Sequence, residues 1–320
     1  MIKNQWYGIL PSKAVRKHRI VAVKRLNLDL AIFRTESGEL GCVVDQCSHR
    51  GAALSLGQVK DSCLQCPFHG LEFDAQGRCQ VIPANGRSST EDISRFNVVS
   101  YPIREAHGII YVWYGENGQQ TDTLPFFPEI DQSFVYSELA DQWHAHYSRA
   151  IENQLDVVHL PFVHATTIGR GNRTLVHGPK AVFENETLIT SPDNEVDVGQ
   201  PQKPASACEI GDLQLNFKFP NLWMNRISDN LKVVIYFAPV DDENTILYIR
   251  FYHNFTPFKP LNQLIALFGK YGNLKIERQD KRVVVTQQPK ASSLRSAEKL
   301  LPGDGPIILY RKIREELKNK

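Results

Sequence analysis

The chain has 320 residues, of which 42% are hydrophobic and 22% are charged. This is the composition of a globular protein, and it excludes a disordered chain, a coiled coil and a collagen. The 37 basic and 35 acidic residues leave a net charge of +2, which gives no reason to expect a nucleic-acid partner or an anionic membrane surface. At roughly 150 residues per domain, the length predicts two domains.

The cellular location is predicted from what the sequence lacks. No run reaches the ~20 apolar residues that a membrane-spanning helix needs, and the first residues lack the basic region and apolar core of a signal peptide. We therefore expect a cytoplasmic protein. In that compartment the six cysteines are expected to be reduced or metal-bound rather than disulfide-bonded, and five of them fall between Cys42 and Cys79.

Residues 1–117 are predicted to form a β-rich domain, because short apolar runs alternate with Gly, Asn and Asp. The clearest runs are 20–23, 29–33, 41–44 and 108–114. A polar stretch, Gly115–Thr123, then leads into a proline-containing segment. We place the domain boundary there, with a second domain over residues 118–320.

The second domain is predicted to mix helices and strands. We expect helices from about Ser148 to Leu160, from Leu261 to Gln288 and from Ile307 to Leu317. Strands are expected over 181–190, 213–219, 231–238 and 245–255. Residues Ser191–Ala207 are polar and rich in Pro, Asp and Gln, and we expect a mobile surface loop there.

Two short segments of the first domain each pair a cysteine with a histidine. The chain reads Cys47-Ser-His49 and, sixteen residues later, Cys66-Pro-Phe-His69. Two Cys and two His suit a zinc site, but zinc fingers usually pair Cys with Cys and His with His. The spacing C-x-H…C-x-x-H instead indicates a Rieske [2Fe-2S] cluster, in which one iron takes both Cys and the other both His. The alternatives are zinc and four unrelated core residues.

The second domain contains two histidines, His159 and His164, five residues apart. On an ideal helix this spacing separates them by about 140°, too far for one small ion. Pro161 lies between them, and we expect it to kink the helix and bring His164 back toward His159. Two imidazoles and one carboxylate form the facial triad of non-haem Fe(II) oxygenases. The alternative is an amphipathic helix with histidines in the core.

The third ligand of this site is expected from another segment. Our candidate is Asp280, with Glu277 as the alternative. Asn153, Asp156 and His159 follow one another at intervals of three residues, so a helix would place all three on one face. We expect Asp156 to accept the free ring N–H of His159 rather than to bind the metal itself.

With both motifs, the chain resembles the oxygenase (alpha) component of the Rieske non-haem iron oxygenases. The segment Asn153–His159 is similar to the monooxygenase branch, which includes dicamba O-demethylase, vanillate O-demethylase and caffeine N-demethylase. The resemblance also covers Trp6-Tyr7, Gln279-Asp280 and Tyr310-Arg311-Lys312. It implies an α+β fold, with a β-rich Rieske domain and a helix-grip (START-like) catalytic domain built on an antiparallel sheet.

The resemblance also implies cofactors, partners and activity. The cofactors would be the [2Fe-2S] cluster, held by Cys47, His49, Cys66 and His69, and a mononuclear Fe(II), held by His159, His164 and Asp280. A homotrimer would pass electrons between subunits along His69, Asp156 and His159, with Asp156 and Asn153 serving catalysis. The chain has no Gly-rich dinucleotide fingerprint, so a separate NAD(P)H-dependent reductase or ferredoxin would supply the electrons.

The expected function is therefore that of a terminal oxygenase. It would use O₂ to hydroxylate or oxidatively demethylate a small aromatic or heterocyclic substrate. The alternatives are a subunit of a ring-dihydroxylating dioxygenase, a non-catalytic Rieske electron carrier and a zinc-stabilised binding protein.

The substrate cavity is expected to be apolar, with a few polar groups that orient the substrate. The polar candidates are Asn225, Arg226 and His253. The apolar and aromatic candidates are Leu155, Val158, Phe162, Phe217, Phe219, Trp223, Phe237, Phe251 and His253.

Overall fold

The chain folds into two units, which comprise Lys3–Leu124 and Pro125–Lys320 apart from the first two residues. The structure is a computed structural model that describes residues 1–169 and 173–320, without the side chains at positions 267, 269–271 and 273. The division between the units falls at the end of the polar stretch, shortly after the boundary predicted at residue 117. Within the described residues, no helix is both long and apolar enough to cross a membrane.

The first unit consists of three small antiparallel sheets. Its strands are β1 (Gln5–Pro11), β2 (Ile20–Arg25), β3 (Leu28–Arg34), β4 (Leu40–Val44), β5 (Gln58–Lys60), β6 (Cys63–Gln65), β7 (Glu72–Phe73), β8 (Cys79–Val81), β9 (Ile103–Ala106) and β10 (Ile109–Tyr114). The sheets have the orders β1-β10-β9, β2-β3-β4 and β5-β6-β7-β8. The central strand β10 reads IIYVWY and is buried on both faces, which explains its unbroken apolar run.

Both Cys–His segments follow directly from strands of this unit. The first begins three residues after β4 ends, and the second connects β6 to β7. Because β4 and β6 are anchored in different sheets, the two segments are held by separate rigid supports.

The second unit is built around a seven-stranded antiparallel sheet with the order β11-β19-β18-β17-β16-β14-β13. Its strands are β11 (Val135–Trp143), β13 (Ala181–Glu184), β14 (Thr187–Thr190), β16 (Gln214–Lys218), β17 (Leu222–Ser228), β18 (Leu231–Pro239) and β19 (Thr245–His253). The strands β12 (Thr174–His177) and β15 (Asp193–Val196) form a separate pair. These sheets confirm the predicted α+β class with an antiparallel sheet in the second domain.

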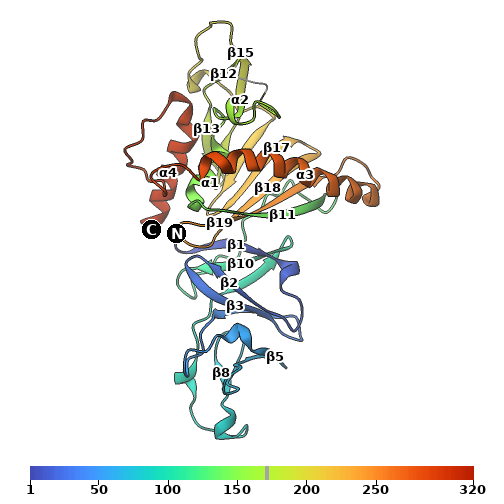
Figure 1. Ribbon diagram of the computed structural model, residues 1–320, viewed down its shortest axis with the longest axis vertical. Coiled ribbons are helices and arrows are strands. Elements are labelled where there is room, and N and C mark those ends of the chain that lie inside the picture. Colours follow the sequence, from blue (N-terminus) through green and yellow to red (C-terminus); the bar gives the residue numbers. More distant parts are fainter. Residues whose placement is uncertain (170–172) are drawn as a thin grey trace. The chain divides into compact units, whose positions relative to one another are not determined.

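The described residues of the second unit also form the helices α1 (Tyr147–Leu155), α2 (Leu160–Val163), α3 (Lys259–Val284) and α4 (Gly305–Lys318). The long helix α3 runs across the sheet and packs on β11 and β19 (Figure 1). This is the arrangement expected of a helix-grip domain, and the two C-terminal helices fall close to their predicted ranges.

Two predictions for the middle of the chain are wrong. The segment 181–190 is not one strand, because Asn185 and Glu186 both have positive φ and form a two-residue turn between β13 and β14. The segment Ser191–Ala207 is not a plain loop, because it contains β15, which pairs with β12. The Asn185-Glu186 turn lacks the Asn-Gly or Asp-Gly signal that would have revealed it.

A buried network of charges joins α1 to the C-terminal segment. Both oxygens of Glu152 accept hydrogen bonds from Arg311, at 2.7 and 2.9 Å, and Oε2 also accepts one from Arg149 at 3.0 Å. Glu298 pairs with both arginines at 2.7 and 2.9 Å. The arginines and Glu152 are all buried, so each charge relies on its partners to offset its desolvation. This network fixes α1 in place.

We therefore expect Arg311→Met to destabilise the protein by about 3–5 kcal/mol, because it leaves two carboxylates with too few partners. Urea unfolding followed by far-UV circular dichroism would measure the change. Lys312→Met is the matched control, since Lys312 is exposed on the same helix. Equal stability of the two variants would contradict the role assigned to the network.

Candidate metal centres

The two Cys–His loops have the same backbone hydrogen bonds. In the first loop, the Cys47 N–H donates to the Ala52 carbonyl at 2.8 Å, and the Gly51 N–H donates to the Cys47 carbonyl at 2.9 Å. The second loop repeats both bonds around Cys66, at 2.8 and 3.1 Å. Each loop thus turns back on its own cysteine, and the two loops offer equivalent positions to a shared ligand.

A glycine in the left-handed region closes each loop. Gly51 has φ +72° and Gly70 has φ +74°, a backbone conformation that residues with a side chain rarely adopt. At Gly70 a Cβ atom would also lie 3.1 Å from Pro83. These two positions therefore require glycine.

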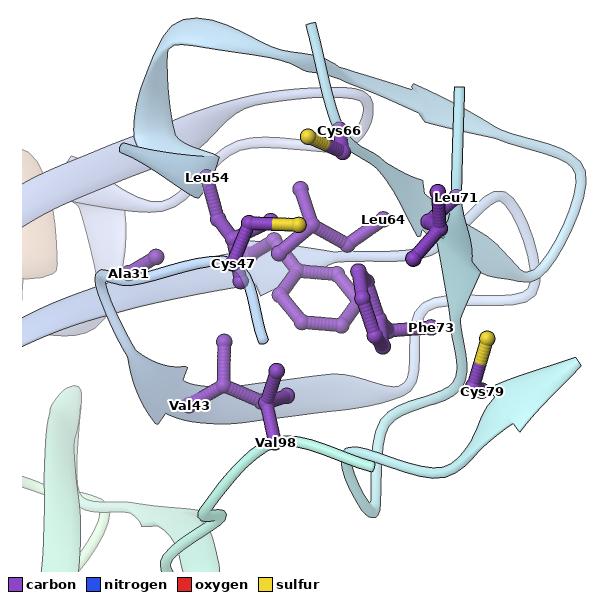
Figure 2. Close-up of a cluster of buried hydrophobic side chains, with 11 residues drawn as sticks. Ala31, Val43, Cys47, Leu54, Leu64, Cys66, Leu71, Phe73, Cys79 and Val98 are labelled. Atoms are coloured by element: carbon purple, nitrogen blue, oxygen red, sulfur yellow. The ribbon is translucent and has the colours of Figure 1, made fainter. Parts of the chain in front are cut away.

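The cysteines of the loops are buried and the histidines are exposed. Cys47 and Cys66 are each 3% exposed and belong to a hydrophobic cluster with Leu71, and Figure 2 shows their sulfur atoms directed toward one another. The rings of His49 and His69 lie on the exposed side, with centroids 4.5 Å apart. The structure thus brings together the four predicted cluster residues, with sulfur inside and nitrogen at the surface, which fits a cluster that binds one iron through each pair.

The other cysteines of this region behave as ordinary thiols. Burial raises the pKa of Cys42, Cys63 and Cys79, so all three remain protonated at neutral pH. A protonated thiol is a poor nucleophile and a poor metal ligand. In Figure 2 the sulfur of Cys79 lies apart from those of the two loop cysteines.

The second candidate centre joins His159, His164 and Asp280. One ligand atom from each residue lies within 4.8 Å of the others. Asp280 Oδ1 is 3.4 Å from His159 Nε2 and 3.0 Å from His164 Nε2. This buried oxygen accepts no hydrogen bond with acceptable geometry from any described residue. Two imidazoles and one carboxylate that converge in this way fit a divalent iron ion.

The charges at this centre favour a cation. Burial alone would lower the pKa of His159, but the carboxylates of Asp156 and Asp280 outweigh it and raise this pKa to about 9. Burial would raise the pKa of Asp280, yet the two histidines hold it below its usual value. The site therefore stabilises positive charge between its side chains.

A break in the helix positions the first two of these residues. Helix α1 ends at Leu155, and Asp156 has extended backbone angles of −79° and 125°. The Asp156 Oδ1 then accepts the N–H groups of Val158 at 2.6 Å and His159 at 3.4 Å. The prediction of one helix through Leu160 is therefore wrong, and so is the shared helical face of Asn153, Asp156 and His159.

The proline also has a different role from the one predicted. Pro161 lies in the first turn of the separate short helix α2, where it loses no hydrogen bond. The turn at Asp156, rather than a kink at Pro161, brings the two histidines together. Asp156 Oδ2 lies 3.5 Å from His159 Nδ1, on the side where a hydrogen-bond partner was expected.

Gln279 contacts the candidate iron centre, and the sequence analysis gave it no role there. Its Oε1 lies 2.9 Å from His164 Nδ1 and accepts a hydrogen bond from Thr167. A hydrogen bond from Nδ1–H leaves the lone pair of Nε2 free to bind a metal. Its position directly before Asp280 was the available signal.

Glu277, the alternative third ligand, lies outside this group of residues. Its Oε1 accepts a 2.6 Å hydrogen bond from Trp143 Nε1, and its side chain lies in the wall of a neighbouring cavity. Burial and the nearby Asp141 carboxylate raise the pKa of Glu277 to about 8. The carboxyl group is therefore mostly protonated at neutral pH.

A cavity of about 800 Å³ opens beside this centre. Its floor comes from one face of the sheet, because the strand residues that line it are alternate residues. These are Leu215, Trp223, Asn225, Ile227, Val233, Ile235 and Ile249. Asn153, Asp156 and the three candidate iron ligands lie in its wall. The space is therefore mainly aliphatic, with the candidate metal centre at one side.

Part of the rim of the cavity is apolar, although the exposed Arg173, Asn194 and Glu195 also line it. Ile168 and Val196 line it and are 55% and 66% exposed. Leu213 and Ile227 line it too and are each 39% exposed. The apolar lining thus continues outward to the solvent.

Most of the predicted lining residues lie elsewhere. Of the nine apolar and aromatic candidates, all within the described residues, Trp223 alone lines the cavity, as does Asn225 among the polar candidates. Phe217 and Phe219 instead pack against Tyr310 of α4, with ring centroids 5.5 and 5.7 Å apart. They stabilise the contact between the sheet and α4.

Comparison with known protein families assigns both units. Residues 5–102 match the Rieske [2Fe-2S] domain, and residues 143–320 match the vanillate O-demethylase oxygenase C-terminal domain. The second match alone covers more than half of the chain. It contains all three residues of the candidate iron centre.

Two relatives illustrate the range of similar sequences. Chlorophyllide a oxygenase of Chlamydomonas reinhardtii is 34% identical over 171 residues, which are 53% of this chain and 26% of that protein. The oxygenase component of chloroacetanilide N-alkylformylase from Rhizorhabdus wittichii is 30% identical over 192 residues, which are 59% and 53% of the two chains. The chain thus spans only about a quarter to a half of the length of these relatives.

Solved structures share the fold over almost the whole chain. NdmA of Pseudomonas putida CBB5 has a TM-score of 0.77 at 23% identity and covers 99% of this chain and 90% of its own. Dicamba monooxygenase bound to dicamba has a TM-score of 0.75 at 18% identity, with coverages of 100% and 98%. At these identities the likeness is one of fold.

The raised pKa of Glu277 predicts how stability depends on pH. The folded protein holds this proton up to about pH 8, whereas the ordinary value is 4.5, so stability is lost as the pH rises through this window. Glu277→Gln removes the effect. We expect the Tm of Glu277→Gln minus the Tm of the wild type to increase by roughly 5 °C from pH 5 to pH 9. A constant difference in Tm across this range, measured by calorimetry, would contradict the prediction.

Proposed function

The chain belongs to the Rieske oxygenases whose catalytic domain is of the vanillate O-demethylase type, and we propose that it acts as a terminal oxygenase. In this proposal it uses O₂, together with electrons from a separate reductase or ferredoxin, to hydroxylate or oxidatively demethylate a small aromatic or heterocyclic substrate. Its resident groups are the [2Fe-2S] cluster of the Rieske domain and a mononuclear Fe(II).

One observation carries the proposal. The buried Asp280 Oδ1 faces the Nε2 atoms of His159 and His164 in the wall of the cavity. These three residues would hold the iron, and a set of three protein ligands would leave coordination positions for O₂. An electron carrier has no use for such a centre beside a cavity. When bound, the iron supplies the site at which O₂ is reduced.

We assign the transfer of electrons to residues around the two centres. His49 and His69 are exposed, which suits a cluster that takes electrons from a partner protein. The side chain of Asp156 is 24% exposed and lies beside His159. Part of its carboxylate is therefore accessible to a second subunit. We therefore propose a homotrimer in which His69 of one subunit meets Asp156 of the next.

The cavity supports a substrate with an apolar body. Its aliphatic floor excludes water from the reacting carbon, and Asn153 and Asn225 are the amide groups that orient polar atoms of the substrate. The proposed reactions follow those named for similar proteins, such as the monooxygenase that binds dicamba. Hydroxylation of a methyl carbon that is bonded to O or N leads to loss of that methyl group as formaldehyde. A cytoplasmic location stays a prediction.

Metal analysis tests the two-centre assignment. We expect about three irons and two acid-labile sulfides per chain in anaerobically prepared protein. His159→Ala should lower the iron to about two and leave the spectrum of the reduced cluster unchanged. His144→Ala is the matched control, since His144 is exposed and bonded to Asn244. Zinc without sulfide, or full iron in His159→Ala, would refute the assignment.

The Asp156 variants test the proposed electron path. Asp156→Ala should leave both metal centres loaded and nearly abolish turnover, because the link between subunits is lost. Asp156→Asn retains an oxygen for the turn at Val158, so it separates the negative charge from the fold. Stopped-flow measurement of cluster re-oxidation with O₂ and substrate gives the rate at which electrons leave the cluster along the proposed path. Normal coupled turnover in both variants would rule out this path.

A further inference from the structure

Four side chains form a polar contact between α3 and β11. Glu277 and Lys281 are one helical turn apart on α3, and Trp143 and Asp141 are alternate residues on β11. Trp143 Nε1 donates to Glu277 Oε1 at 2.6 Å. Lys281 Nζ donates to both oxygens of Asp141 at 2.9 Å. The two carboxyl groups thus lie next to each other, and each is held by a different donor.

This contact reaches from the cavity to the solvent. Glu277 lies in the cavity wall and is 5% exposed. The side chains of Asp141 and Lys281 are 21% and 29% exposed. Asp280 follows Glu277 at the spacing of three residues that makes neighbours on a helix. Glu277 therefore stands between the candidate iron centre and a carboxylate that water can reach.

The carboxyl group of Glu277 can carry a proton, and the neighbouring Asp141 carboxylate can exchange that proton with it. Oε2 of Glu277 is buried and accepts no hydrogen bond from a described residue, so it is the oxygen free to carry a proton. Burial and the negative charge of Asp141 hold that proton, while the bond from Trp143 and the charge of Lys281 weaken its hold. With a pKa of about 8, Glu277 is mostly protonated at neutral pH, and a carboxyl group whose pKa lies this close to the working pH transfers protons efficiently.

We propose that Glu277 and Asp141 form a proton relay that carries protons from solvent to the cavity. The need for such a relay rests on the proposed function. Insertion of one oxygen atom follows R–H + O₂ + 2e⁻ + 2H⁺ → R–OH + H₂O, with the electrons supplied by the separate reductase. Among the described lining residues, the other carboxyl groups are Asp156 and Asp280 at the candidate iron centre and Glu195 at the rim, which is paired with His177. Glu277 is the lining carboxyl group that lies beside an exchange partner outside the cavity. Glu277 releases its proton to the cavity, and Asp141 replaces it from water.

Infrared spectroscopy of the resting protein tests the relay without turnover. We expect the C=O stretch of a protonated carboxyl to be present at pH 6 and lost by pH 10, and to be absent in Glu277→Gln. In Asp141→Asn the midpoint of this change should fall by roughly one pH unit, because a like charge has been removed. The absence of any band that Glu277→Gln removes would overturn the proposal.

A pH jump then measures the transfer itself. After a drop from pH 10 to pH 6, the Glu277 band should return at least about tenfold more slowly in Asp141→Asn than in the wild type. Arg278→Gln is the matched control, since Arg278 is exposed beside Glu277, and should match the wild-type rate. An equal rate in Asp141→Asn would overturn the relay.

These outcomes are independent of the proposed function. Glu277→Gln keeps an oxygen that accepts the bond from Trp143, so we expect it to fold and to retain both metal centres. If the mononuclear iron is present but the infrared tests contradict the relay, this inference is wrong and the oxygenase assignment is unaffected. A protein without the second iron would instead remove the oxygenase assignment, whatever the infrared result.

Discussion

The candidate iron centre of the second unit depends on one buried carboxylate oxygen, Asp280 Oδ1, to which no described residue donates a hydrogen bond. A buried carboxylate without partners is strongly unfavourable, yet Asp280 Oδ1 faces two imidazole nitrogens at 3.0 and 3.4 Å and accepts no hydrogen bond from the described residues. A cation among these atoms resolves the conflict. The surrounding structure holds the three groups in place: α3 delivers Asp280, the turn at Asp156 delivers the histidines, and Gln279 orients one of them.

The residues of both centres were predictable to the extent that their spacing is local. Cys47 with His49, Cys66 with His69, and His159 with His164 each lie within a few residues of one another, so ligand chemistry alone selects them. Asp280 lies far along the chain from His164, and no periodic pattern connects the two. The sequence therefore left Asp280 as one of two candidates, with Glu277 as the other, and the structure places the Asp280 carboxylate against both imidazoles.

Other features depend on contacts that a single sequence does not reveal. The side chain of Asp156 competes with the helix for backbone N–H groups, and it ends α1 in a stretch whose composition predicts a continuous helix. The cavity lining depends on where each strand meets its neighbours. Phe217 lies on the same face as Leu215, but it falls one step closer to α4 and packs on Tyr310 instead of lining the cavity.

The apolar part of the cavity rim also affects which molecules bind at the opening. Around the opening, hydrocarbon surface is exposed to water at Ile168, Val196, Leu213 and Ile227. An apolar molecule that covers this surface removes it from water, which is favourable. These four residues therefore favour the entry of apolar compounds over that of strongly hydrated ones, while Arg173 and Glu195 keep another part of the rim charged. Selection among substrates therefore begins with apolar contacts at the cavity opening, before a molecule reaches the residues inside.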